Sequence, residues 1–255
     1  MKNCFIYLLP LAFCHSASAQ DLPTGFKNWF SLGTDLEVNK KLDIEISELN
    51  CFNTGPMVLQ FTQLSLGASY KLGKRTYLLS GIEQFHFRSG SNYNLYHKAS
   101  AGLLLRKLAR LPIKQSLEAE WFFPRQKKHR LRGIYTVSYS LKNDFLPLHG
   151  RPFIKGQVYY YLGGAPLTYY DGNGDQIAYQ SPNDLHRYRL TGGLSLRPIK
   201  YLTLAIYYVW NKEFNTGLFD KRALNIPSKD GTRTKYAFND YSVLGASLTY
   251  QLKLD

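Results

Sequence analysis

Apolar and polar residues alternate with a period of two along most of the chain. In the runs 64–72, 117–123 and 244–252, every second residue is apolar and its neighbours are mostly Ser, Thr, Gly, Glu, Gln or Lys. Successive side chains of a β-strand point to opposite faces, so each run predicts a strand with one apolar and one polar face. The pattern therefore indicates an all-β protein.

The predicted strands are long for a soluble protein. They run for about 10 to 14 residues, which is the length of a tilted membrane strand, whereas an average soluble strand has about 5 to 6. A soluble sandwich produces the same alternation, but not this length. The predicted strands cover residues 26–38, 41–52, 57–72, 76–88, 93–106, 113–123, 130–142, 152–162, 185–197, 200–212 and 240–254.

The connections between predicted strands alternate between short and long. Short ones lie at 39–41, 73–75 and 197–200, and long ones at about 163–184 and 213–239. Tight turns at one end and longer loops at the other are typical of outer-membrane barrels. We therefore expect an antiparallel transmembrane β-barrel with no free sheet edge.

The number of predicted strands is odd. Eleven segments are found, but bacterial single-chain barrels prefer even numbers. We therefore expect ten or twelve strands. Either the stretch 213–239 contains another strand, or the N-terminal segment does not pair as drawn.

The first residues have the layout of a secretory signal peptide. Lys2 is followed by an apolar stretch at 4–14 and by small residues at 17–19. The apolar stretch is too short to span a bilayer as a helix, although a short buried helix is an alternative. We expect a signal peptide at 1–19 and a single barrel domain at 20–255 in the outer membrane of a Gram-negative cell.

Composition supports export to a membrane. The chain has 20 Tyr and 15 Phe, with aromatic pairs and triplets near strand ends at 121–123, 159–161 and 207–208. Such residues settle where hydrocarbon meets lipid headgroups. The formal charge of +14 suggests an anionic partner. In an exported protein nucleic acid is not expected, so we expect outer-membrane lipid and lipopolysaccharide; oligomeric state is not predicted.

Several short motifs follow one another along the chain. They are Ala19-Gln20, Trp29, Leu42-Asp43-Ile44-Glu45, Arg130-Leu131-Arg132-Gly133, Tyr188-Arg189-Leu190 and Gly192-Gly193. In this order they resemble the uncharacterised outer-membrane barrels grouped as domain-of-unknown-function family 2490. The resemblance covers nearly all of residues 20–255, and it implies a barrel fold and an outer-membrane location but no activity.

Charged residues on the polar strand faces form one predicted cluster in the lumen. They are Asp43, Glu45, Glu118, Glu120, Arg132, Lys155, Arg187 and Arg189. The cluster fits either a charged pore or anionic-solute site, or a salt-bridged plug; narrow barrels are packed, which favours a largely filled lumen. Because 113–123 and 130–142 are consecutive, we expect Arg132 to lie closer to Glu120 than to Glu118. Arg132→Ala should then lower the melting temperature more than Arg125→Ala.

A basic run lies in a predicted outer loop after an aromatic triplet. Arg125, Lys127, Lys128 and Arg130 either contact lipopolysaccharide phosphates or belong to a solvated loop. With the lumen cluster, this run favours a structural or small-solute barrel, with a scaffold or lipopolysaccharide-binding barrel as an alternative.

A lipid-modifying acyl hydrolase is the other alternative. His86 with Ser89, and Asn94 with His97 and Ser100, are the nearest catalytic combinations. A spacing of three places residues on opposite faces of a strand, so neither set converges by itself. We therefore expect a protein that is not an enzyme.

No metal or cofactor is expected. Asp171, Asn173 and Asp175 match the first ligand positions of a calcium loop, but the sixth and twelfth positions lack its Gly and Glu. The segment 168–180 instead predicts a projecting β-hairpin with a Gly-rich tip.

Overall fold

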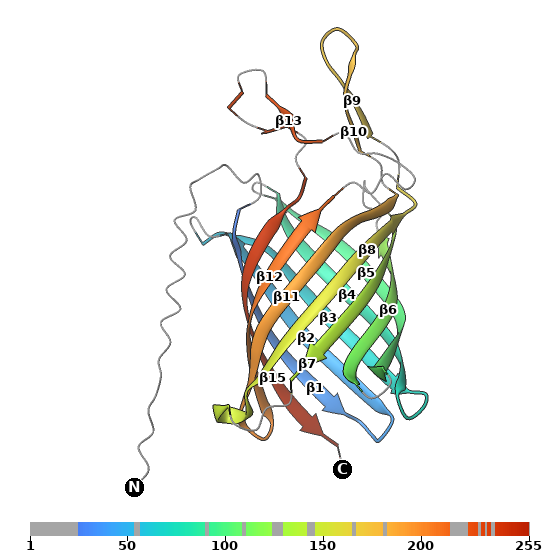
Figure 1. Cartoon of the computed structure of the whole chain (residues 1–255), viewed down its shortest axis with the longest axis vertical. Coiled ribbons are helices and arrows are strands. Elements are labelled where there is room, and N and C mark those ends of the chain that lie inside the picture. Colours follow the sequence, from blue (N-terminus) through green and yellow to red (C-terminus); the bar gives the residue numbers. More distant parts are fainter. Residues whose placement is uncertain are drawn as a thin grey trace.

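Eleven long strands close into one barrel in the computed structural model of the chain (Figure 1). The structure describes residues 25–53, 57–89, 92–108, 111–123, 130–141, 146–164, 167–180, 183–214, 224–228, 231–232, 234–235 and 238–254. The barrel strands are β1 (Lys27–Glu37), β2 (Leu42–Asn53), β3 (Leu59–Lys71), β4 (Thr76–Ser89), β5 (Asn92–Leu108), β6 (Leu111–Phe123), β7 (Leu131–Ser140), β8 (Arg151–Leu162), β11 (Asp184–Ile199), β12 (Leu202–Glu213) and β15 (Tyr241–Lys253). Each agrees with its predicted segment to within two residues, so the alternation located every strand.

The expectation of ten or twelve strands is wrong. Every neighbouring pair in the barrel is antiparallel except β1 and β15, which run parallel in register from Lys27↔Val243 to Glu37↔Lys253. An even number is required only when all pairs are antiparallel, and the parallel seam removes that requirement. Within the described part of 213–239, β13 (Ile226–Pro227) and β14 (Thr234–Lys235) pair with each other outside the barrel.

The two ends of the barrel differ. At the end where β15 finishes, which we call the short-turn end, Asn39 closes the β1–β2 turn by accepting backbone N–H groups from Lys41 and Leu42 at 2.8 and 3.0 Å. Strands β8 and β12 end, and strands β11 and β15 begin, at the opposite, long-loop end (Figure 1).

Loop length does not alternate strictly. Only residues 90–91 separate β4 from β5 at the long-loop end, whereas 141–150 separate β7 from β8 at the short-turn end and include the 3-10 turn η1 (Pro147–His149). The predicted alternation of short and long connections therefore holds only in part.

The predicted hairpin is confirmed. Strands β9 (Leu167–Tyr170) and β10 (Gln176–Gln180) pair and project from the long-loop end (Figure 1). The Asp171 carboxylate accepts backbone N–H groups from Asn173 at 2.8 Å and Asp175 at 2.9 Å, so it stabilises the tip itself.

Every barrel strand turns large apolar side chains outward. One exposed example from each strand, in chain order, is Leu32, Ile46, Leu66, Ile82, Leu103, Leu117, Tyr135, Ile154, Leu190, Ile206 and Leu244. The opposite face of each strand points inward. On most strands it is the more polar face, as the period of two predicted, but on β4 it also carries Leu79, Phe85 and Phe87.

One close contact shapes the barrel wall beside the seam. Gly245 of β15 is paired with Tyr207 of β12, and a Cβ atom at Gly245 would lie 2.1 Å from the Tyr207 ring. Glycine is required here because the ring lies over the neighbouring backbone. By contrast, a Cβ atom at Gly192 of β11 would meet nothing within 4 Å.

The predicted signal peptide, residues 1–19, lies outside the described residues. Among the residues that are described, no helix is long and apolar enough to cross a membrane.

Candidate functional site

The barrel interior holds three contiguous cavities. The lower cavity, of about 820 Å³, lies toward the short-turn end, and the upper cavity, of about 550 Å³, lies toward the long-loop end. A middle cavity of about 360 Å³ lies between them, and Gln63 of β3 lines all three.

All members of the predicted lumen cluster line these cavities. Asp43 and Glu45 line the lower cavity, Glu118 lines the lower and upper cavities, Glu120, Arg132 and Arg187 line the upper cavity, Arg189 lines the upper and middle cavities, and Lys155 lines the middle cavity. All eight residues therefore lie on the inward side of the barrel wall.

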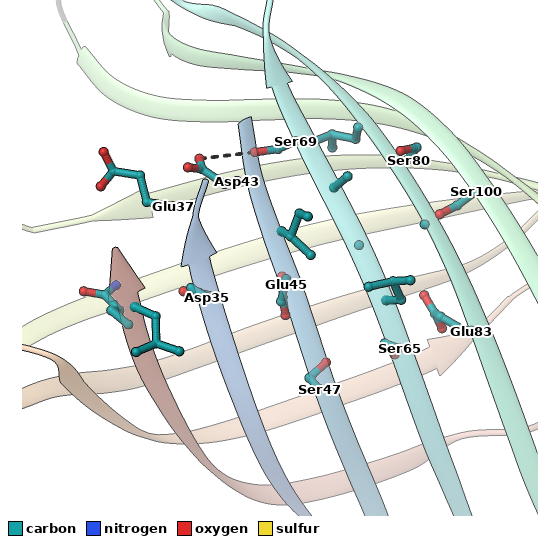
Figure 2. Close-up of a pocket in the computed structure, with 18 of the residues that line it drawn as sticks. Asp35, Glu37, Asp43, Glu45, Ser47, Ser65, Ser69, Ser80, Glu83 and Ser100 are labelled. Atoms are coloured by element: carbon teal, nitrogen blue, oxygen red, sulfur yellow. Dashed lines mark hydrogen bonds between the residues drawn. The ribbon is translucent and has the colours of Figure 1, made fainter. Parts of the chain in front are cut away.

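Carboxylates cover one wall of the lower cavity. Asp35 is paired in register with Glu45, and Glu37 with Asp43, so like charges lie opposite each other on β1 and β2 (Figure 2). Such pairs are destabilising unless they are solvated or compensated. Lys253 forms an ion pair with Glu37 at 2.8 Å. Among the described residues, Asp35 and Glu45 have no ion pair.

A continuous chain of polar contacts crosses five neighbouring strands in the wall of the upper cavity. Gln63 donates to Glu83 at 2.7 Å, and Lys98 Nζ lies 2.7 Å from Glu83 and 2.5 Å from Glu120. Arg132 Nε then lies 2.5 Å from the second oxygen of Glu120. The chain alternates in sign, so each charge has an opposite neighbour.

The predicted position of Arg132 is confirmed. It is paired in register with Glu120, whereas Glu118 is opposite Ile134. Glu120 is only 4% exposed, and the Arg132 guanidinium also lies 5.3 Å from the centre of the Tyr159 ring. A buried charge of this kind needs its partner, because water does not compensate for the loss.

A second ion pair lies at the rim of the upper cavity. Arg187 of β11 is paired in register with Glu213 of β12, and its Nη2 donates to a Glu213 carboxylate oxygen. Glu213 was not among the predicted site residues because the predicted strand ended at residue 212. Lys98 and Glu83 were also missed. Lys98 lies on the polar face of its predicted strand, but the face that carries Glu83 also carries Leu79, Phe85 and Phe87.

Arg189 and Lys155, both partly buried, differ from Lys98, Arg132 and Arg187. Arg189 Nη2 donates to the hydroxyl of Tyr241 at 2.9 Å, and its guanidinium lies 5.5 Å from the Trp29 ring centre and 5.3 Å from that of Tyr159. Within the described part of the chain, neither Arg189 nor Lys155 forms an ion pair with a carboxylate.

A polar patch interrupts the outward apolar surface near the long-loop end of β2, β3 and β4. Asn50 donates to Glu48 at 2.7 Å, and Thr62 donates to Asn50 at 2.7 Å. His86 is paired in register with Thr62 and is hydrogen-bonded to Gln84 at 2.6 Å. The sequence carried a signal for this patch, because polar residues occupy the otherwise apolar face at the ends of three predicted strands.

The combination of Asn94, His97 and Ser100 considered from sequence does not converge in the structure. His97 stacks on Phe123 at 5.5 Å between ring centres, whereas Ser100 lines the lower cavity. The two residues therefore lie on opposite sides of the wall. The side chain of Ser89 lies outside the described part, so the set with His86 is not resolved.

The structure describes one member of the predicted basic loop. Arg130 is exposed, and its guanidinium lies 4.4 Å from the centre of the outward Trp121 ring. Arg125, Lys127 and Lys128 lie outside the described residues.

The residues that are described include no group of His, Cys, Asp or Glu side chains arranged to hold a metal ion. Searches against known protein families and against curated proteins return no match for this chain. Its functional interpretation therefore depends on the geometry of the barrel itself.

Proposed function

We propose that the protein is an outer-membrane barrel of a Gram-negative cell, with a structural or small-solute role and a charged, narrowed lumen. The observation that carries this proposal is the outward apolar surface present on all eleven strands. Leu32 is 62% exposed, Ile82 59% and Leu117 64%. A belt of this kind promotes aggregation in water but matches the hydrocarbon of a bilayer.

Other features support the membrane location. The chain begins with the layout of a signal peptide, and Trp121 and Trp210 point outward, as expected for residues near a membrane interface. The resemblance to family 2490 agrees with this location, and we propose membership of that family on the motifs described above.

Cell fractionation tests the membrane location. We expect the mature protein in the outer-membrane fraction, released by detergent and not by high salt. Recovery from the soluble periplasmic fraction without detergent would contradict the proposal.

The geometry of the lumen favours passage or binding of small solutes over a wide channel. The chain from Gln63 to Arg132 and the rings beside Arg132 and Arg189 narrow the upper half of the lumen, and water-filled porins need about sixteen strands. Planar bilayers test this point. Small steady conductance supports passage, and its increase in the variant Glu120→Ala/Arg132→Ala would identify the ion-pair chain as the constriction. Silence in both proteins would refute passage.

Two alternatives each have one supporting observation. Arg130 over the outward Trp121 favours lipopolysaccharide binding, which would weaken in Arg130→Glu. The outward patch around His86 favours an activity toward lipids, which would be supported by acyl hydrolysis that is lost in His86→Ala but retained in His97→Ala.

A further inference from the structure

Two cations lie side by side in the middle of the lumen. Lys155 of β8 is paired in register with Thr191 of β11, and Arg189 lies two residues before Thr191 on the same inward face. Arg189 and Lys155 are the charged side chains that line the middle cavity. This cavity therefore has a positive wall and no negative one.

The rest of the middle cavity is rich in hydroxyl groups. These belong to different strands around the barrel and can all donate hydrogen bonds. They are carried by Ser31, Ser47, Ser65, Thr191, Tyr207 and Ser247. Apolar side chains, including Trp29, Leu49 and Phe153, complete the lining. The cavity thus combines positive charge, hydroxyl donors and an apolar surface.

Arg189 and Lys155 lack the carboxylate partner that Lys98, Arg132 and Arg187 each have. Among the described residues, Arg189 donates a hydrogen bond to the Tyr241 hydroxyl, its Nε has no partner, and neither Arg189 nor Lys155 has a carboxylate within ion-pair distance. A partly buried cation without a counter-charge is unfavourable, so a bound anion would relieve that cost.

We propose that the middle cavity binds a small organic anion, with its oxyanion group between Arg189 and Lys155 and its apolar part against Trp29. The cavity of about 360 Å³ has the volume of about twelve water molecules, which suits a small carboxylate or phosphate ester. This inference rests on the proposed small-solute function and names its substrate class. Because the middle and upper cavities share Trp29, Leu49 and Arg189, the anion has a route from the long-loop end.

Tryptophan fluorescence offers a direct test. The chain has three Trp residues, and Trp121→Phe/Trp210→Phe leaves Trp29, which lines the cavity, as the single reporter. The purified barrel in detergent is titrated with benzoate, with inorganic phosphate and with neutral benzamide at constant ionic strength. We expect a saturable signal with benzoate and none with benzamide. A saturable signal with phosphate would identify the oxyanion alone as sufficient, whereas equal signals with benzoate and benzamide would overturn the proposal.

Charge-neutral variants locate the site. Arg189→Gln and Lys155→Gln should each weaken benzoate binding by about tenfold or more, because a hydrogen bond to a charged group contributes at least that factor. Arg197→Gln is the matched control, since Arg197 lines the lower cavity. Unchanged binding in Arg189→Gln would refute the site. If that variant does not fold, Arg189→Lys and Lys155→Gln provide the comparison, and unchanged binding in Lys155→Gln would be equally decisive.

The experiments on binding and on passage test the two proposals independently. Binding measured in detergent needs no conductance, so saturable benzoate binding by a barrel that is silent in bilayers would keep this inference and refute passage. Conductance without benzoate binding would support passage and refute the anion site.

Discussion

Removal of Arg132 tests whether the charges of the upper cavity are truly desolvated. Arg132→Ala leaves Glu120, which is 4% exposed, with Lys98 at 2.5 Å as its remaining partner. Breaking a buried ion pair costs about 3–5 kcal/mol. Because Lys98 still compensates part of the Glu120 charge, we expect a loss of unfolding free energy near the lower end, about 3 kcal/mol.

The control is an exposed ion pair in the same barrel. Lys253 and Glu37 lie 2.8 Å apart, with side chains that are 60% and 43% exposed. Lys253→Ala should cost about 0.2–1 kcal/mol, as is usual for solvated pairs. Lys253 replaces Arg125 as the control because Arg125 lies outside the described residues.

Urea unfolding in detergent micelles, followed by tryptophan fluorescence and by gel mobility, gives both free energies. Equal losses for Arg132→Ala and Lys253→Ala would refute the reasoning and show that water reaches Glu120. The variant Glu120→Leu/Arg132→Met adds a second check. Replacement of both partners by apolar residues should recover much of the loss, because no buried charge is then left alone.

Two further predictions use matched substitutions. Gly245→Ala should cost about 1–3 kcal/mol, because the new Cβ atom meets the Tyr207 ring, whereas Gly192→Ala should change stability by less than about 0.5 kcal/mol. Urea unfolding distinguishes them, and equal effects would contradict the close contact. Leu117→Arg should destabilise the barrel in liposomes by about 2–4 kcal/mol if Leu117 faces mid-bilayer, and Trp121→Arg, nearer the strand end, by about 0–1 kcal/mol. Equal costs in liposomes would argue against the proposed membrane depth.

Most strands could be predicted from sequence because a period of two extends through them. The seam could not, because pairing between β1 and β15 joins residues such as Lys27 and Val243 and leaves no local pattern. The rule of even strand number misled for the same reason, since it presumes an antiparallel contact at this position.

Several residues of the candidate site could be predicted from sequence, but most of the contacts between them could not. Period and polarity identified Glu120 and Arg132 as inward, and their consecutive strands identified them as neighbours. The longer chain of polar contacts also includes Lys98 and Glu83. Its formation depends on the register of three further strand pairs, which the sequence pattern does not specify. Glu213 was not predicted because the predicted strand ended one residue before it.

The parallel seam also determines where the two ends of the barrel wall are found. In an even-stranded barrel the first and last strands are antiparallel, so the start of the first strand lies beside the end of the last. Here the start of β1 at Lys27 and the end of β15 at Lys253 lie at opposite ends of the barrel, one strand length or about 35 Å apart. A short linker therefore cannot join them to make a circular permutant. Peptide tags fused next to Lys27 and Lys253 would be displayed on opposite sides of any membrane that the barrel crosses.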